Sequence, residues 1–291
     1  MHFVLTPGVH ILIINRATLI IMYHYLIAGK RLFSYAQWRI MDFIALLGLI
    51  IGIGAIIAGN IAEGGATSHL AQVAAAIIVF GGTAGATMLS FPFNDLRTAL
   101  SALRLVFTYK RTNPALLIED SVNILVQARR IGLVALQPQI ELIENRFLRK
   151  GLALVVDGMP PKMIKDILEQ EIISYEARMR RAAKVFESAG GYAPTIGILG
   201  AVLGLIQVMS NVADPSKIGA GISVAFVATI YGVGSANLVL LPCAKRILSR
   251  MNEQIFLMDL AVEGVLGVES GVNPYFLRAK LNAFLADNEK L

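Results

Sequence analysis

The sequence is poor in the residues that form disulfides and metal sites. It has one cysteine, Cys243, and its four histidines are scattered without the regular spacing of metal ligands. A single cysteine cannot form a disulfide within the chain, and a zinc site needs several suitably spaced cysteine or histidine ligands. The glycine-rich run at 81–85 lacks the lysine and hydroxyl residue that end a phosphate-binding loop. We therefore expect no metal site, no cofactor and no enzymatic activity.

Charged residues are missing from four long hydrophobic segments. A helix needs about 20 residues to cross about 30 Å of hydrocarbon, and only a helix satisfies its own backbone there. The segments of suitable length are 43–62, 70–89, 194–212 and 218–241. We expect an all-α integral membrane protein, with four transmembrane helices in two hairpins and a helical cytoplasmic domain between the second and third helices.

Basic residues are also absent from the links within the two hairpins, where Lys217 is the one exception. Many basic residues lie instead between the second and third spans and after the fourth. By the positive-inside tendency that side is cytoplasmic, which predicts a multi-pass membrane protein. The net charge of +6 thus follows mostly from topology. Acidic residues alternate too evenly with the arginines for a nucleic-acid groove, so we expect no nucleic-acid partner.

The first forty residues do not fit this pattern. An apolar stretch at 9–29 is divided by Arg16, which is costly at the centre of a membrane helix, and Met41 opens a sequence typical of an uncleaved first span. We favour a dispensable or mis-assigned extension, with a peripheral or fifth membrane helix as the alternative. The expected domains are the extension (1–40), hairpin 1 (41–91), the cytoplasmic domain (92–190), hairpin 2 (191–242) and a cytoplasmic tail (243–291).

The charged segments read as helices with negligible β structure. Apolar residues recur there at intervals of three and four, and a turn at 157–161 places a proline at a helix start. The expected helices cover 95–109, 116–130, 138–149, 161–188 running into the third span, a segment from the fourth span to about 265, and 274–285.

Small residues recur at four-residue spacing within the spans, as in Gly48 and Gly52 or Gly200 and Gly204; Gly81 and Gly85 form a third pair. Such pairs let helix backbones approach closely in lipid. Packing is the favoured interpretation, and a sliding interface between helices is the alternative.

Carboxylates, which ion pathways generally use, are missing from the spans. If the chain conducts ions, a partner must supply the acid. The last two spans offer hydroxyl groups instead, although most such groups simply bond to the backbone carbonyl one turn earlier. The hydroxyl residues are Thr195, Ser223, Thr229, Tyr231 and Ser235.

The sequence from residue 41 onward resembles the MotA/PomA family of flagellar motor stator subunits. The resemblance rests on ordered motifs at family-like spacing. They are GNIAEGG (59–65), FGGT (80–83), ARRIGLVAL (128–136), KG (150–151), VDG (156–158), APTIG (193–197), ATIYG (228–232) and NLVLLP (237–242).

The resemblance implies a ring of identical subunits, five in number, around two copies of a MotB/PomB-like single-span partner whose membrane Asp carries the ion. It implies that ion passage turns the ring and that the cytoplasmic torque domain pushes a FliG-like rotor switch protein. Pro194 and Pro242 would couple ion binding to conformational change. Thr195 and Thr229 would line the ion path, and Ala201 stands where sodium-type members carry threonine, which favours protons.

One position departs from the family pattern. The rotor-facing helix in the family has an arginine followed eight residues later by a glutamate, whereas Arg129 is followed here by Gln137. Glu141 and Glu144 lie one and two turns further on and are candidates to replace the lost charge. Arg129 and Arg130 remain the expected rotor contacts, with a plain solvated pair as the alternative interpretation.

Two other functions fit parts of the sequence. An ExbB/TolQ-like energiser of envelope processes would use a similar ring, but those chains usually place their large cytoplasmic segment after the first of three spans. A passive membrane scaffold would explain the glycines and the topology but not the ordered motifs. We expect a stator subunit that forms an ion channel and couples ion flow to rotor torque for motility.

Overall fold

The computed structural model describes residues 40–41, 43–65, 70–109, 113–213 and 215–285. The expectations for residues 1–39 lie outside the described residues. Within the described part, four helices are long and apolar enough to cross a membrane, at 43–62, 73–90, 161–210 and 218–269. The prediction of four transmembrane helices is confirmed.

The first hairpin consists of helix α2 and a second, composite helix. Helix α2 covers Phe43–Ala62, the predicted range, and none of its residues is buried. The second helix begins at Val73, three residues later than predicted, and combines α3 (Val73–Ala76), a π-helical segment η2 (Ile77–Gly81) and α4 (Gly82–Ser90). Exposed apolar side chains along α2 are those expected of a helix that faces lipid.

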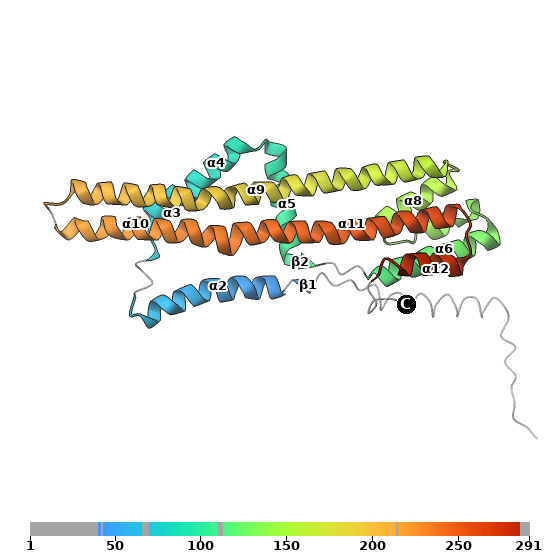
Figure 1. Ribbon diagram of the computed structural model, residues 1–291, viewed down its shortest axis with the longest axis horizontal. Coiled ribbons are helices and arrows are strands. Elements are labelled where there is room, and N and C mark those ends of the chain that lie inside the picture. Colours follow the sequence, from blue (N-terminus) through green and yellow to red (C-terminus); the bar gives the residue numbers. More distant parts are fainter. Residues whose placement is uncertain (1–39, 42, 66–69, 110–112, 214, 286–291) are drawn as a thin grey trace, which may run out of the picture. The chain divides into compact units, whose positions relative to one another are not determined.

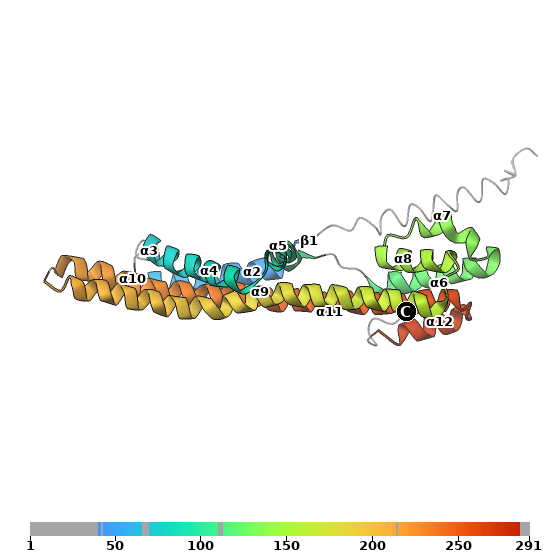
Figure 2. The same ribbon diagram turned by 90° about the horizontal axis from the view of Figure 1, so that it is seen from above.

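The second hairpin extends far beyond the predicted spans. Helix α9 runs without a break over Pro161–Ser210, and its partner combines α10 (Pro215–Ser235), a π-helical segment η4 (Ala236–Leu240) and α11 (Leu241–Glu269). The two long helices lie side by side in both views (Figures 1 and 2). At 1.5 Å per residue, α9 is about 75 Å long, so the same helix continues from the membrane span into the polar part of the chain.

The central segment and the tail contribute shorter helices. Helix α5 runs across α9 rather than along it (Figures 1 and 2), and the residue before it is Pro92. Strands β1 (Ile40–Met41) and β2 (Thr108–Tyr109) pair antiparallel over two residues each. The helices are α5 (Phe93–Phe107), α6 (Pro114–Ile131), η3 (Val134–Leu136), α7 (Gln137–Ile140), α8 (Arg146–Val156) and α12 (Pro274–Asn282).

The prediction of one helix over 138–149 is wrong. Helix α7 ends at Ile140, and α8 begins only after Asn145. The Asn145 Oδ1 atom accepts hydrogen bonds from the backbone N–H groups of Phe147 at 3.0 Å and Leu148 at 2.9 Å. A side chain that caps a helix start satisfies donors that would otherwise be orphaned. The apolar residues keep a helical spacing through 141–145, which is why the sequence predicts one helix. The Asn145 cap instead marks the start of a separate helix, α8.

The larger core lies outside the membrane spans. It is formed by α6, α8, the first part of α9, the last part of α11 and α12, and it includes the fully buried Ile118, Leu152, Leu168 and Leu260. Gly151 allows α8 to approach this core, because a Cβ there would lie 2.6 Å from Val265 Cγ2. The helical domain between the spans therefore packs onto the ends of α9 and α11.

Candidate functional site

The third and fourth spans pack against each other at glycines, which lie next to backbone atoms of the neighbouring helix. A Cβ on Gly204 would lie 2.8 Å from both Ala225 N and Gly221 O, and one on Gly197 would lie 2.9 Å from Ala228 O. Side chains longer than hydrogen are excluded at such distances unless the helices separate. Helices α9 and α10 thus meet along a smooth contact between backbones, as small residues allow in lipid.

The other glycine pairs differ in their surroundings. Gly200 packs against Ala228 and Ile78, and Gly52 lies against Leu238, so packing within the chain is confirmed there. A Cβ at Gly48, Gly81 or Gly85 would meet no described atom within 4 Å. These three positions leave room on the surface of the first two spans.

Pro194 lies inside a continuous helix. Helix α9 passes through it and continues to Ser210, although proline removes one backbone hydrogen bond. The expectation that Pro194 stands at the entrance of the third span rests on the sequence, and the helix neither begins nor ends there. Because proline has no backbone N–H, the helical hydrogen bond that residue 194 would otherwise donate is absent from α9.

Pro242 also fails to end a helix. It is in the first turn of α11, directly after the π-helical segment η4, and α11 then continues to Glu269. A π-helical turn is uncommon and often marks a functional position, and proline removes a further bond. The membrane part and the polar part of this helix are therefore joined by a locally irregular turn.

Three of the candidate hydroxyl groups bond to the backbone one turn earlier. Thr195 Oγ1 donates to Tyr192 O at 2.8 Å, Thr229 Oγ1 to Ala225 O at 3.2 Å, and Ser235 Oγ to Gly232 O at 3.2 Å. This ordinary arrangement uses the hydroxyl proton as donor. The oxygen of each group keeps acceptor capacity for another partner.

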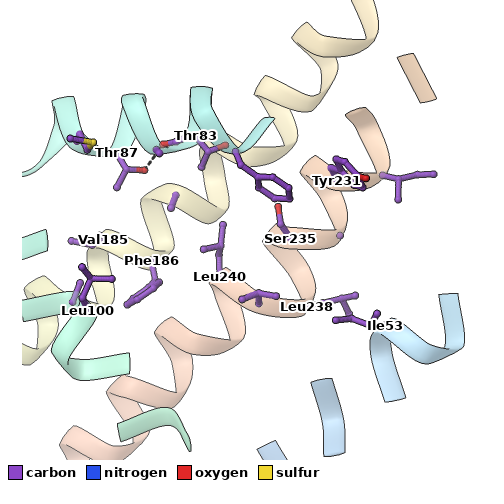
Figure 3. A pocket seen from close by; sticks show the side chains of 18 of the residues that line it. Ile53, Thr83, Thr87, Leu100, Val185, Phe186, Tyr231, Ser235, Leu238 and Leu240 are labelled. Carbon is purple, nitrogen blue, oxygen red and sulfur yellow. Dashed lines mark hydrogen bonds between the residues drawn. The ribbon is translucent and has the colours of Figure 1, made fainter. Parts of the chain in front are cut away.

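Tyr231 and Ser223 bond across to the start of the second span. Tyr231 Oη donates to the carbonyl of Leu70 at 2.5 Å and accepts from the N–H of Gln72 at 3.4 Å. Gln72 Nε2 donates to Ser223 Oγ at 3.1 Å, and the Tyr231 ring stacks on Phe80 with centroids 5.6 Å apart. Figure 3 shows Tyr231 on α10 at one side of a cavity. Sequence reasoning missed Gln72 because nothing in its neighbourhood signals a contact with residues 150 positions away.

The expected rotor contacts lie within a short segment of the chain, and all of them are exposed. Arg129 and Arg130 form the last turn of α6, Gln137 opens α7 and Glu141 directly follows it, and all four side chains are exposed. Gly132, with φ +86°, turns the chain between the two helices. The residues are therefore available to a partner, as the sequence-based hypothesis requires.

Exposed apolar residues accompany these charges, which sequence reasoning overlooked. Ile131, Val134 and Leu142 are 50%, 76% and 73% exposed. Contiguous exposed apolar patches can mark partner-binding surfaces, whereas single exposed apolar residues are ordinary. Ile131 ends α6, Val134 opens η3 and Leu142 lies in the turn after α7.

An acidic group on α11 titrates abnormally outside the spans. Burial, followed by the neighbouring charges of Glu169 and Glu176, raises the pKa of the Asp259 carboxyl above its usual value. On α9, burial raises the pKa of Tyr175, while the guanidinium of Arg178, 5.6 Å from the ring centre, opposes that shift. Among the described residues no group of three or more His, Cys, Asp or Glu is placed to hold a metal ion.

Comparisons with known proteins agree with this arrangement. The model of the MotA/TolQ/ExbB proton channel family matches residues 139–259, and the model of the motility protein A N-terminal region matches residues 46–127. Motility protein A of Bacillus subtilis (strain 168) is 34% identical over 255 residues, which cover 86% of this chain and 93% of that protein. Chemotaxis protein PomA of Vibrio alginolyticus is 30% identical over 250 residues, covering 86% and 98%.

Solved structures give the same assignment. The flagellar MotAB stator complex from Bacillus subtilis matches with a TM-score of 0.78 and 34% identity, covering 84% of this chain and 97% of that one. The MotAB structure from C. jejuni matches with a TM-score of 0.79 and 30% identity, covering 85% and 97%. With its four candidate spans and nearly full coverage of these relatives, the chain belongs to the motility protein A family, a family of multi-pass membrane proteins.

Proposed function

We propose that this chain is a flagellar stator subunit that couples ion flow, carried by protons, to rotation of the rotor. The observation that carries the proposal is the match over nearly the full length of two solved MotAB stators, at 30% and 34% identity. The spans offer hydroxyls and glycines but no carboxylate. A MotB/PomB-like single-span partner would supply the membrane Asp that an ion pathway needs.

In this proposal Thr195 and Thr229 provide oxygen atoms beside the ion path. Their protons are held by backbone carbonyls, so each oxygen can accept a hydrogen bond from a hydrated proton or from the protonated acid of the partner. Ala201 adds no oxygen at the position where sodium-type members carry threonine. A cage with one hydroxyl fewer suits protons better than Na⁺, which needs several oxygen ligands.

Movement would pass from the membrane to the central domain through two long helices. The glycine contact of α9 with α10 lets the spans shift without side-chain interlocking. Pro194 and the turn before Pro242 supply weak points in otherwise continuous helices. Because the central domain packs on the ends of α9 and α11, a rotation of these helices would carry it along.

The rotor contact would be the exposed surface formed by Arg129, Arg130, Gln137 and Glu141. It would press on a FliG-like switch protein as the ring, a pentamer in this proposal, turns in the bacterial inner membrane. Residues 92–190 would then be the torque domain. The rotor-facing charge lost at Gln137 would be replaced by Glu141, one turn further on.

Swimming of stator-less cells tests the function and the ion separately. The chain is expressed with its single-span partner in cells that have intact flagella but no stators of their own. We expect swimming in sodium-free medium that stops when a protonophore is added. Swimming that needs Na⁺ would overturn the ion assignment alone, whereas no swimming despite normal membrane levels of both proteins would overturn the stator assignment.

A further inference from the structure

A large cavity lies among the membrane helices and is lined by residues of several helical segments. Its volume is about 1110 Å³, larger than the roughly 300–1000 Å³ typical of small-molecule pockets. It is bounded by α2, α4, α5 and the α10–η4 segment, with part of α9 as its floor (Figure 3). Ile53 of α2, Leu100 of α5 and Leu238 of η4 mark three of its sides.

The wall of this cavity is suited to hydrocarbon. Besides the aliphatic side chains it presents Phe186 and few polar atoms. Thr87 and Ser235 already donate to Thr83 O at 2.7 Å and to Gly232 O at 3.2 Å, so their protons are occupied. A peptide or sugar in such a space would lose its hydrogen bonds to water without replacement, which costs several kcal/mol per group. An acyl chain carries no such groups.

One donor in the wall is left without a partner. Thr83 is 7% exposed, and its hydroxyl makes no hydrogen bond with any described residue. Buried hydroxyls are nearly always bonded, so an unpaired one points to a missing acceptor. The occupant of the cavity can supply an oxygen atom there.

A free cation stands at the cavity's rim. Arg97 of α5 lines the cavity and is exposed, and among the described residues no carboxylate pairs with it. The acid two residues before it, Asp95, is already paired with Arg181 at 3.4 Å. Arginine binds phosphate through two parallel hydrogen bonds. Arg97 lies seven residues beyond the end of α4, and lipid phosphates are expected near the end of that span.

We propose that this cavity, the lipid groove, holds an anionic membrane phospholipid, with an acyl chain among α2, α4, α5 and η4 and its phosphate on Arg97. The apolar wall selects hydrocarbon, and the unpaired guanidinium selects a negative head group. None of the residues of α2 is buried by the rest of the chain. A lipid in the groove would therefore cover the side of α2 that lines it. The proposal needs only that the chain lies in a membrane, and it stands or falls independently of the stator function.

The head-group contact is tested with two charge variants on the same helix. Arg97→Gln is compared with Arg104→Gln, which removes another exposed arginine of α5 that does not line the groove. The full chain is purified with its partner subunit in mild detergent, and retained phosphatidylglycerol is measured by native mass spectrometry. One basic residue near a membrane surface contributes about 1 kcal/mol, so we expect Arg97→Gln to lower retention about fivefold and Arg104→Gln to leave it unchanged. Equal losses in both variants would overturn the proposal, as would full displacement of the lipid by inorganic phosphate.

The acyl-chain position is tested with a phospholipid that carries a photoreactive diazirine in its chain. We expect cross-links concentrated on the groove side of α4, α5 and η4, and we expect Ile230→Trp, which fills the groove, to remove most of them. Ile222→Trp is the matched control, because Ile222 lies on α10 with similar exposure outside the groove. Cross-links that are spread evenly over all exposed faces would contradict a specific lipid-binding site. The proposal would be overturned if no cross-links form in the groove and cysteines engineered there form disulfides between two copies of the chain. The occupant of the groove would then be a second copy of the chain.

Discussion

Gly232 of α10 lies so close to Ala193 of α9 that a Cβ on Gly232 would stand 2.5 Å from the Ala193 carbonyl oxygen. Backbone atoms cannot move aside as a flexible side chain can, so any side chain at this position must push the helices apart. The contact lies one residue before Pro194, where α9 has lost a backbone hydrogen bond. The most crowded glycine between the two spans therefore lies beside the turn of α9 that lacks a backbone hydrogen bond.

Gly232→Ala should destabilise the protein and reduce swimming, whereas Gly234→Ala should do neither. A Cβ at Gly234 meets no described atom within 4 Å, so the pair differs in crowding and not in residue type. Overpacking of this kind costs about 1–3 kcal/mol. The measurements are the thermal unfolding midpoint of the purified protein and spreading in soft agar. Equal effects of the two changes would contradict the close contact.

Tyr231→Phe should lower stability by about 1 kcal/mol, because it removes the hydrogen bond to Leu70 and keeps the ring stacked on Phe80. Tyr192→Phe is the control, since the partner of its hydroxyl among the described residues is the exposed Ser90, at 3.0 Å. We expect a clear fall in the unfolding midpoint for the first variant and a small one for the second. A larger fall for Tyr192→Phe than for Tyr231→Phe would show that the hydrogen bond to Leu70 does not stabilise the start of the second span.

Asp259→Asn should stabilise the protein at neutral pH. The pKa of this carboxyl is raised in the folded state, so the folded protein holds the proton more tightly than the unfolded chain does. The stabilisation from protonated Asp259 is complete below the pKa of the unfolded chain and is lost as pH rises through the raised folded value. Thermal unfolding from pH 4 to 8 should show the variant's advantage growing with pH. An advantage that is constant or that shrinks with pH contradicts the raised pKa.

Arg130→Glu should abolish most swimming while leaving the protein folded. The side chain is exposed and surface charges contribute less than about 1 kcal/mol to stability, so the loss would come from the rotor contact. Lys162→Glu reverses an exposed charge at the start of α9 and serves as the control. Swimming speed and binding to the rotor switch protein are the readouts. If Lys162→Glu impairs both as strongly, the rotor surface is not the one proposed.

Much of the fold could be predicted because hydropathy and length constrain membrane helices strongly. The predicted range 43–62 coincides with α2, and the long helix from Pro161 into the third span is confirmed. The second span begins at Val73 and not at residue 70, and the backbone of Leu70 and Gln72 before it bonds to the Tyr231 hydroxyl. The helix over 138–149 failed because a single cap at Asn145 outweighed the apolar period.

The site was less predictable, because contacts between distant segments leave little local trace. Four-residue spacing identified Gly200 and Gly204 as packing residues, but the same spacing at Gly81 and Gly85 faces open space. Pro194 and Pro242 lie at the outer ends of the predicted spans 194–212 and 218–241, whereas helical structure continues on both sides of each proline. The lipid groove depends on α2, α4, α5 and η4 together, and no periodicity in one segment could reveal it.

Rotation of tethered cells tests the stator function most directly. Cells that lack all their own stators receive this gene together with the gene of its single-span partner, and the rotation of each cell body is recorded. We predict rotation only when both genes are present, and we predict that it stops when the partner's membrane Asp is changed to Asn. Cells that stay still despite intact flagella and normal membrane levels of both proteins would contradict the account, as would rotation that persists after the Asp is replaced.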